Sequence, residues 1–219
     1  MCTRSEFGLK VLIVLALCAN PAFAHEIAAV VRDGTGAPLA DAVVVAVAEV
    51  APKLSAPMRE SIVQETKEFR PFVKAVLVGT PIEFPNRDDV QHHVYSFSPA
   101  RTFELKAYAG TPADPIVFDK PGVVALGCNI HDWMLAYIYV SESPYFGVTG
   151  AEGRVLLAGL PAGRYTVRVW HPRLTESEAS TSQAVSVTNN GGVEVAWALK
   201  LKRDARIRRA PTGAGSSYR

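Results

Sequence analysis

Three residues with metal-binding side chains stand at intervals of three near the middle of the chain: Cys128, His131 and Met134. They follow an apolar run at 122–127 that predicts a β-strand, and residues 136–140 predict another strand directly afterwards. The segment is therefore expected to fold as strand, tight loop and strand. The loop would carry a thiol, an imidazole and a thioether, and its two anchoring strands would limit rearrangement of these groups.

This combination of side chains favours copper. A Cys and two His in one plane, with a weakly bound axial Met, form the blue-copper arrangement. A second His is then needed, and the segment at 84–96 supplies His92 and His93. The alternative is a buried, unreactive cysteine beside a core methionine. Zinc fingers and structural disulfides would need further cysteines that survive processing.

At this point the sequence resembles the cupredoxins, the plastocyanin and amicyanin family. In that pattern a strand ends at an Asn, as at Asn86, and a short loop leads to a ligand His. The match from 86 to 94 has no gaps, and the spacing Cys128-x2-His131-x2-Met134 is the short amicyanin-like one. The resemblance covers roughly residues 68–141.

The resemblance implies a Greek-key β-sandwich with one copper ion, whose loops gather at one end. It assigns His92, Cys128 and His131 as equatorial ligands and Met134 as the axial ligand. His93 departs from the pattern, because the family commonly has an Asn there that ties the two ligand loops together. Since adjacent strand residues point to opposite faces, His93 is expected to point away from the copper.

The first 24 residues have the features of a secretory signal peptide. They contain two basic residues, an apolar stretch at 11–19 and a small-residue cleavage site ending at Ala24. Cleavage there would start the mature chain at His25 and leave Cys128 as the one remaining cysteine of an oxidising compartment, where a lone thiol is a liability unless a metal holds it. The sequence thus predicts a periplasmic or secreted protein without a membrane span. A lipid-modified start at Cys18 is the alternative, although a leucine precedes it where a small residue is usual.

The charge distribution gives no sign of a nucleic-acid surface. Between residues 25 and 199 acidic residues outnumber basic ones by five, whereas residues 200–219 hold seven Lys and Arg. Residues 203–219 are predicted to form a disordered basic tail. Two further histidines, His25 and His171, lie outside the ligand motifs and are expected to be structural.

Outside the copper motifs the sequence resembles a carboxypeptidase regulatory-like (transthyretin-like) β-sandwich. The opening hairpin with the run at 36–45 matches its start, and residues 150–165 match its "acidic-Gly, strand, Leu-Pro-x-Gly-x-Tyr" signature. Alternation supports strands independently, since Tyr165, Val167 and Val169 fall on one face. Chains of this composite type resemble those labelled methylamine utilisation proteins, a label that implies no particular reaction.

These observations predict an all-β protein of two sandwiches. Residues 25–57 and 142–202 are expected to form one discontinuous sandwich, and residues 58–141 the inserted cupredoxin domain. Insertion is physically tolerable because the ends of a domain often lie close together. The rival is two sequential domains, with the N-terminal hairpin in the cupredoxin barrel.

The expected function is single-electron transfer between redox partner proteins in the periplasm. The alternatives are copper binding and delivery between a donor and an acceptor, and a structural interaction module that a metal merely stabilises. An enzyme is not expected, because a closed four-ligand site has no open position for substrate and no catalytic triad or carboxylate pair stands out.

Overall fold

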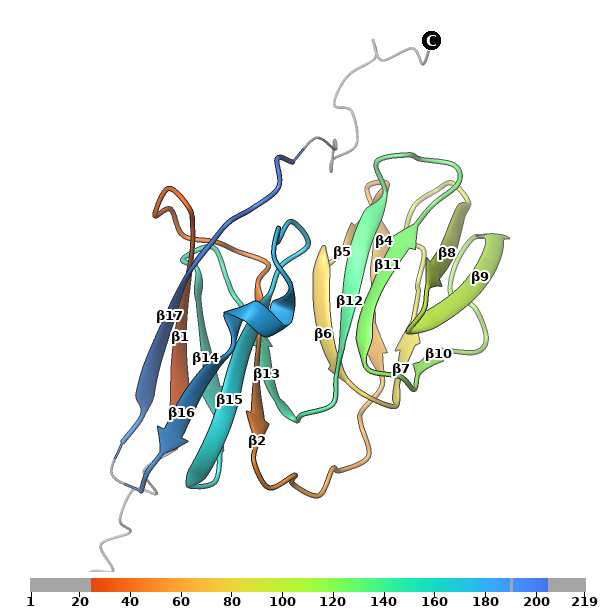
Figure 1. The fold of residues 1–219 in the computed structure, drawn as a ribbon. Coiled ribbons are helices and arrows are strands. Elements are labelled where there is room, and N and C mark those ends of the chain that lie inside the picture. The colour runs from red at the N-terminus through yellow and green to blue at the C-terminus, as the bar shows by residue number, and fades with distance from the viewer. Residues whose placement is uncertain (1–24, 190, 205–219) are drawn as a thin grey trace, which may run out of the picture.

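The computed structural model describes residues 25–189 and 191–204, and this part of the chain is all β apart from one short 3-10 helix (Figure 1). The expected signal peptide and the tail from residue 205 onwards lie outside the described residues. No helix in the described part is long and apolar enough to cross a membrane. The strands are β1 (Glu26–Asp33), β2 (Val43–Ala48), β3 (Glu60–Ser61), β4 (Val63–Glu65), β5 (Glu68–Arg70), β6 (Val73–Leu77), β7 (Thr80–Glu83), β8 (His92–Ser98), β9 (Arg101–Tyr108), β10 (Ile116–Phe118), β11 (Gly122–Gly127), β12 (Leu135–Ser141), β13 (Tyr145–Val148), β14 (Arg154–Ala158), β15 (Gly163–Trp170), β16 (Gln183–Val187) and β17 (Val193–Leu199), and the helix is Glu178–Thr181.

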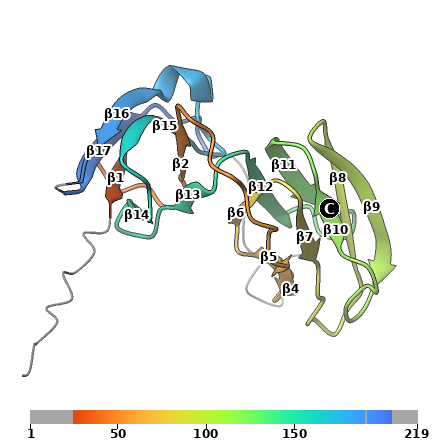
Figure 2. The same cartoon turned by 90° about the horizontal axis from the view of Figure 1, so that it is seen from below.

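The first sandwich joins the two ends of the described chain. One sheet has the strand order β14-β1-β17, and the facing sheet has the order β13-β2-β15-β16. β1 pairs antiparallel with β14 and parallel with β17, while β2 lies between β13 and β15. Figures 1 and 2 show these early and late strands side by side. Strands from the two ends of the described chain thus pair with one another in both sheets.

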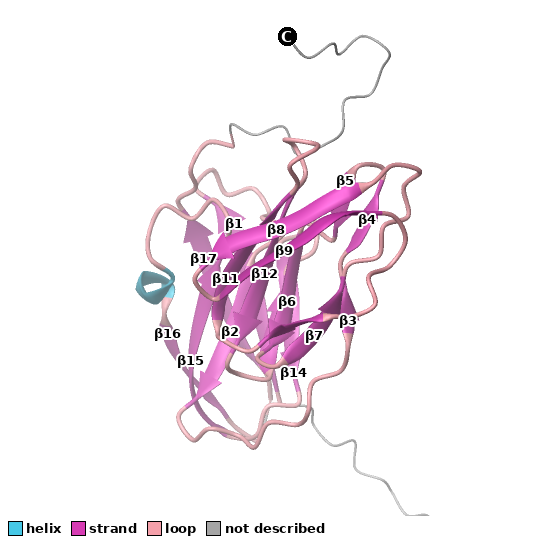
Figure 3. Ribbon diagram, turned by 90° about the vertical axis from the view of Figure 1, so that its right-hand side faces the viewer, coloured by secondary structure: helices cyan, strands magenta, loops and turns pink. Residues whose placement is uncertain are grey.

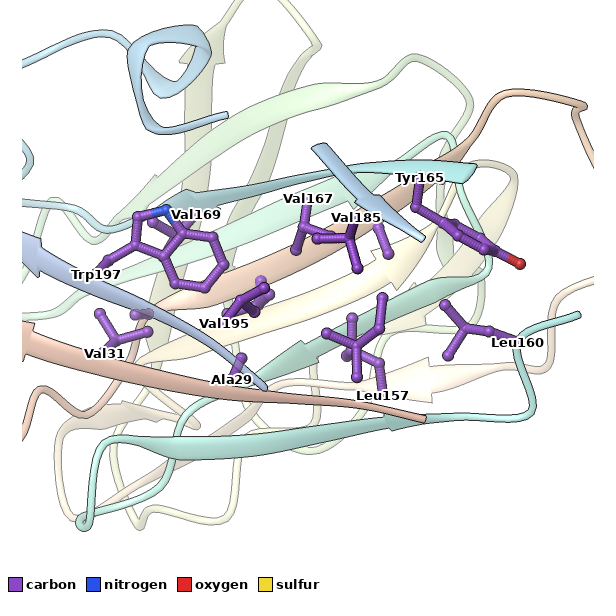
Figure 4. Close-up of a cluster of buried hydrophobic side chains, with 14 of the residues drawn as sticks. Ala29, Val31, Leu157, Leu160, Tyr165, Val167, Val169, Val185, Val195 and Trp197 are labelled. Atoms are coloured by element: carbon purple, nitrogen blue, oxygen red, sulfur yellow. The ribbon is translucent and has the colours of Figure 1, made fainter. Parts of the chain in front are cut away.

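Alternating apolar residues build the core of this sandwich. Tyr165, Val167 and Val169 all point inward from β15, as their period of two predicts. Trp197 faces them from β17 (Figure 4). Its indole N–H donates to the Thr181 carbonyl at 2.7 Å, which satisfies the one polar atom of a buried ring. The core is therefore apolar, and the indole N–H buried at its edge has a hydrogen-bond partner.

The second sandwich is formed by strands β3 to β12, which lie between β2 and β13 in the sequence. Its larger sheet has the order β6-β12-β11-β8-β9, its smaller sheet the order β10-β7-β3, and β4 and β5 form a separate hairpin (Figure 3). A second apolar core fills it, and Cys128 and Met134 belong to that core. Both candidate ligand segments are thus anchored in one sheet, since β8 carries His92 and pairs with β11 next to Cys128.

A third apolar cluster joins the two sandwiches. Val43 and Val45 on the outer face of β2 pack with Val73 of β6 and Tyr139 of β12. The chain passes between the sandwiches at 141–144. Ser141 and Ser143 are buried there although Glu142 is exposed, and the Ser143 hydroxyl donates to the carbonyl of Ala46 at 2.6 Å.

Gly153 provides a test of the first sandwich. Its φ is +65°, and a Cβ there would lie 2.3 Å from the Val31 carbonyl oxygen and 2.8 Å from the Leu39 nitrogen. Gly153→Ala should lower the free energy of unfolding by about 2 kcal/mol or more, because strain and a backbone clash combine. Gly150→Ala is the matched control, since no heavy atom lies within 4 Å of its added Cβ. Urea unfolding measures both, and equal stabilities would contradict the packing described.

Candidate metal centre

The centre is built from two segments that are distant in the sequence. β11 and β12 pair antiparallel, and the loop that joins them holds Cys128, His131 and Met134. β8 begins at His92 and pairs with β11 at its end, where Tyr95 is the partner of Gly127. A Cβ at Gly127 would lie 2.7 Å from the Tyr95 ring, so only glycine allows this close approach directly before the cysteine.

The structure brings His92, Cys128 and His131 together, with one potential ligand atom from each within 4.8 Å of the others. His92 is fully buried and Cys128 is 5% exposed, whereas His131 is partly exposed. In the described part of the chain, the buried Nδ1 atoms of His92 and His131 have no hydrogen-bond partner. Buried polar atoms are normally paired, so two unpaired imidazole nitrogens beside a buried thiol fit a site for a metal ion.

Asp88 determines which nitrogen of His92 is available. Nε2 of His92 lies 2.7 Å from Oδ2 of Asp88, and a carboxylate can only accept, so Nε2 carries a hydrogen and Nδ1 is the nitrogen left for a metal ion. Burial raises the pKa of Asp88, but backbone N–H groups of Lys67 and Thr66 and the imidazole of His92 outweigh it, so that the pKa is lowered overall. The carboxyl group is therefore held ionised.

Apart from the two imidazoles, the described surroundings of the Cys128 thiol are largely apolar. The backbone N–H of Ile130 donates to Sγ of Cys128 at 3.4 Å. Hydrogen bonds of this type tune a metal-bound sulfur. The sulfur otherwise belongs to the apolar core of the second sandwich.

His131 is the ligand candidate nearest to the surface. Burial is the first cause that lowers its pKa, and the charges of His92 and Lys67 act in the same direction. Its ring lies 4.9 Å from that of His92 and 5.1 Å from that of Trp133. Ile130 beside it is 50% exposed, so apolar surface lies next to this imidazole.

Trp133 is partly buried and packs against the core of the second sandwich. Its indole N–H donates to the Lys67 carbonyl at 2.9 Å. It also lines a cavity of about 230 Å³ together with Phe72 and Met134, and Asp41 of the first sandwich reaches the same cavity. Ile130 is thus exposed beside His131, whereas the Trp133 indole N–H is directed to the β4–β5 hairpin.

Met134 is 2% exposed and packs in the same apolar core as Cys128. Its backbone N–H donates to the carbonyl of His131 at 3.0 Å, which closes the turn of the loop. The axial role of its sulfur stays a prediction from the sequence.

His93 is not part of the cluster. It is buried, and its Nε2 lies 2.9 Å from Oε1 of Glu104 on β9. The side chain therefore points away from Cys128, as expected for the neighbour of an inward-facing strand residue, although it is more buried than a half-exposed strand position would be.

The contacts of Asp88 with His92 and with the backbone of Thr66 and Lys67 were not predicted from the sequence. No spacing rule points to them, because contacts between a loop carboxylate and a distant turn follow from tertiary structure. Asn86 has a visible role in the same loop. Its side chain donates to the carbonyls of Val90 and Tyr108 at 2.8 and 2.9 Å and so holds the loop that leads to His92.

Comparison with known proteins gives no matching family model and no matching curated protein. Solved structures that are similar to parts of the chain include copper proteins. A purple cupredoxin from Nitrosopumilus maritimus is 22% identical over 37% of this chain and 98% of its own, with a TM-score of 0.33. Amicyanin from Paracoccus versutus (Thiobacillus versutus) is 15% identical over 37% of this chain and 79% of its own, with a TM-score of 0.32.

The copper-containing nitrite reductase NirK from Thermus scotoductus SA-01 is 23% identical over 52% of this chain, with a TM-score of 0.37. The match spans 28% of that enzyme's own length. All of these identities and TM-scores are low, so the assignment of a metal centre depends on the ligand geometry of this chain.

The two adjacent histidines give a direct test. His92→Ala should abolish stoichiometric Cu(II) binding because it removes a buried ligand, whereas His93→Asn should retain it. Titration followed by visible absorption and elemental analysis measures both. An essential His93 with a dispensable His92 would place the register one residue away from that described.

Proposed function

We propose that this chain is a periplasmic type 1 (blue) copper protein that transfers single electrons between redox partner proteins. The observation that carries the proposal is the convergence of His92, Cys128 and His131 within 4.8 Å around two unpaired imidazole nitrogens. When bound there, one copper ion would supply a one-electron Cu(I)/Cu(II) couple.

The protein residues would supply a rigid and dry ligand set. His92 and Cys128 are held in the core between strands, which keeps water out and limits the movement that a change of charge would otherwise cause. Met134 would be the axial ligand from the end of the same loop. With four protein ligands no position would be left for substrate, which supports electron transfer over catalysis.

His131 would be the point of contact with a partner. It is the most exposed of the three clustered residues, and exposed Ile130 extends the apolar surface beside it. An apolar surface of this kind suits a protein partner, and the acidic body of the chain gives no reason to expect nucleic acid. The predicted signal peptide supports a periplasmic location.

Copper delivery is the second candidate. The burial of His92 and Cys128 favours retention of the ion over rapid release. A reversible reduction potential would support electron transfer, and fast Cu(I) transfer to an acceptor would support delivery. A potential outside the range of cellular donors and acceptors would favour a purely structural role of the metal.

We further propose that residues 25–57 and 142–202 form a carboxypeptidase regulatory-like sandwich that carries the cupredoxin domain, residues 58–141, as an insertion. The strand pairing of β1 with β14 and β17 supports this division. The chain resembles methylamine utilisation proteins only in combining these two types of domain, and this resemblance implies no particular reaction.

The thiolate is tested by Cys128→Ser. The intense visible absorption expected of a Cu(II)–thiolate bond should disappear, because the hydroxyl of serine remains protonated and is a hard, weak ligand. Circular dichroism should show an unchanged β fold. An intense visible band that persists in Cys128→Ser would remove the blue-copper assignment.

The axial position is tested by Met134→Gln. The colour should remain, but the reduction potential should fall, because a harder axial ligand favours Cu(II) over Cu(I). Met58→Gln is the matched control, since Met58 is 83% exposed and outside the core. Protein-film voltammetry measures both variants, and equal potentials would show that Met134 does not bind the copper.

A further inference from the structure

The tip of the β4–β5 hairpin has a backbone conformation that its residues disfavour. Thr66 and Lys67 have φ values of +58° and +57°, and they connect strands that pair from Val63↔Arg70 to Glu65↔Glu68. Two consecutive residues at positive φ form the type I′ turn, which prefers Asn-Gly. A β-branched threonine there is strained, and such strain persists where surrounding contacts over-determine the conformation.

Those contacts lead to the first imidazole of the metal centre. The N–H of Thr66 donates to Oδ1 of Asp88 at 2.6 Å, and the N–H of Lys67 donates to Oδ2 at 2.8 Å. Oδ2 also accepts from Nε2 of His92 at 2.7 Å. The two N–H groups of the turn therefore bind the Asp88 carboxylate, and this carboxylate fixes the ring orientation and the tautomer of His92.

The same turn also contacts the second ligand loop. The carbonyl of Lys67 accepts from the indole N–H of Trp133 at 2.9 Å, and the Trp133 ring lies 5.1 Å from that of His131. Lys67 thus uses its N–H toward the His92 side and its carbonyl toward the His131 side. Within the described residues, the two histidines of the cluster are linked through one peptide segment.

We propose that the Thr66–Lys67 turn, called the clasp below, positions both histidine ligands. It acts on His92 through Asp88 and on His131 through Trp133. This deepens the proposed function and rests on it. In the resembled pattern an Asn at the position of His93 ties the ligand loops together. Here His93 is directed to Glu104, and the β4–β5 turn provides the connection instead.

The clasp has a chemical consequence as well as a geometric one. A carboxylate that accepts from the far nitrogen of a ligating imidazole raises the basicity of the nitrogen that binds the metal. His92 should therefore bind Cu(II) more strongly and lower the reduction potential. Loss of such an outer partner typically weakens metal affinity by about 10- to 100-fold.

The test compares Asp88→Asn with Asp89→Asn in the full-length protein. Both variants lose one negative charge, but Asp89 is exposed. An amide cannot accept from both backbone N–H groups and from His92 as the carboxylate does. Asp88→Asn should lower Cu(II) affinity by about 10- to 100-fold and raise the potential, and Asp89→Asn should change neither.

A second measurement needs no copper. In the metal-free wild-type protein, NMR should show a slowly exchanging, strongly hydrogen-bonded Nε2–H on His92, and this signal should be lost or shifted upfield in Asp88→Asn alone. Equal spectra and equal affinities in the two Asn variants would overturn the role of Asp88. A wild-type protein that shows this signal but gives no Cu(II)–thiolate band would refute the proposed function and leave the clasp intact.

Trp133→Phe tests the other arm without touching the carboxylate. It keeps an aromatic ring beside His131 but removes the donor to Lys67, so the Cu(II) absorption and electron paramagnetic resonance spectra should change while the His92 Nε2–H signal remains. Thr66→Asn keeps the backbone N–H and suits the turn, so it should preserve affinity and potential. Unchanged copper spectra in Trp133→Phe would show that the clasp positions His92 alone and would refute its proposed role in positioning His131.

Discussion

The convergence of one buried thiol with two imidazoles is the constraint on which the rest of this structure depends. Cys128 and His131 come from one loop, His92 comes from another strand, and their ligand atoms meet within 4.8 Å. Holding polar groups so close in an apolar core is costly unless something binds them. The second sandwich meets this requirement by placing β8 next to β11, so that backbone hydrogen bonds set the distance between the two segments.

Much of this arrangement could be predicted from the sequence. Alternation marked the inward-facing residues of β15, and the apolar run before Cys128 marked β11. The unbroken match at 86–94 placed His92, rather than His93, toward the cysteine. The strands follow from periodicity, whereas the choice of His92 is what the resemblance to the cupredoxin pattern implies, and neither needs knowledge of the tertiary structure.

Other features could not be predicted, for physical reasons. The bond between Asp88 and His92 exists because a turn at Thr66–Lys67 folds back on the loop, and nothing in the spacing of these residues indicates it. The segment at 141–144 has the polar composition of a linker, yet Ser143 is buried against β2 because the two sandwiches pack together. In both cases the feature follows from tertiary contacts, which neither the spacing nor the composition of the local sequence indicates.

The central claim is that copper is bound by one cysteine sulfur and two imidazoles. X-ray absorption spectroscopy of the copper-loaded full-length protein tests this most directly, because it reports the atoms around the metal itself. One short Cu–S interaction and two imidazole nitrogens are expected in both oxidation states, with little change in the copper–ligand distances between them. A copper ion surrounded only by nitrogen and oxygen, or one whose ligands exchange on reduction, would contradict it.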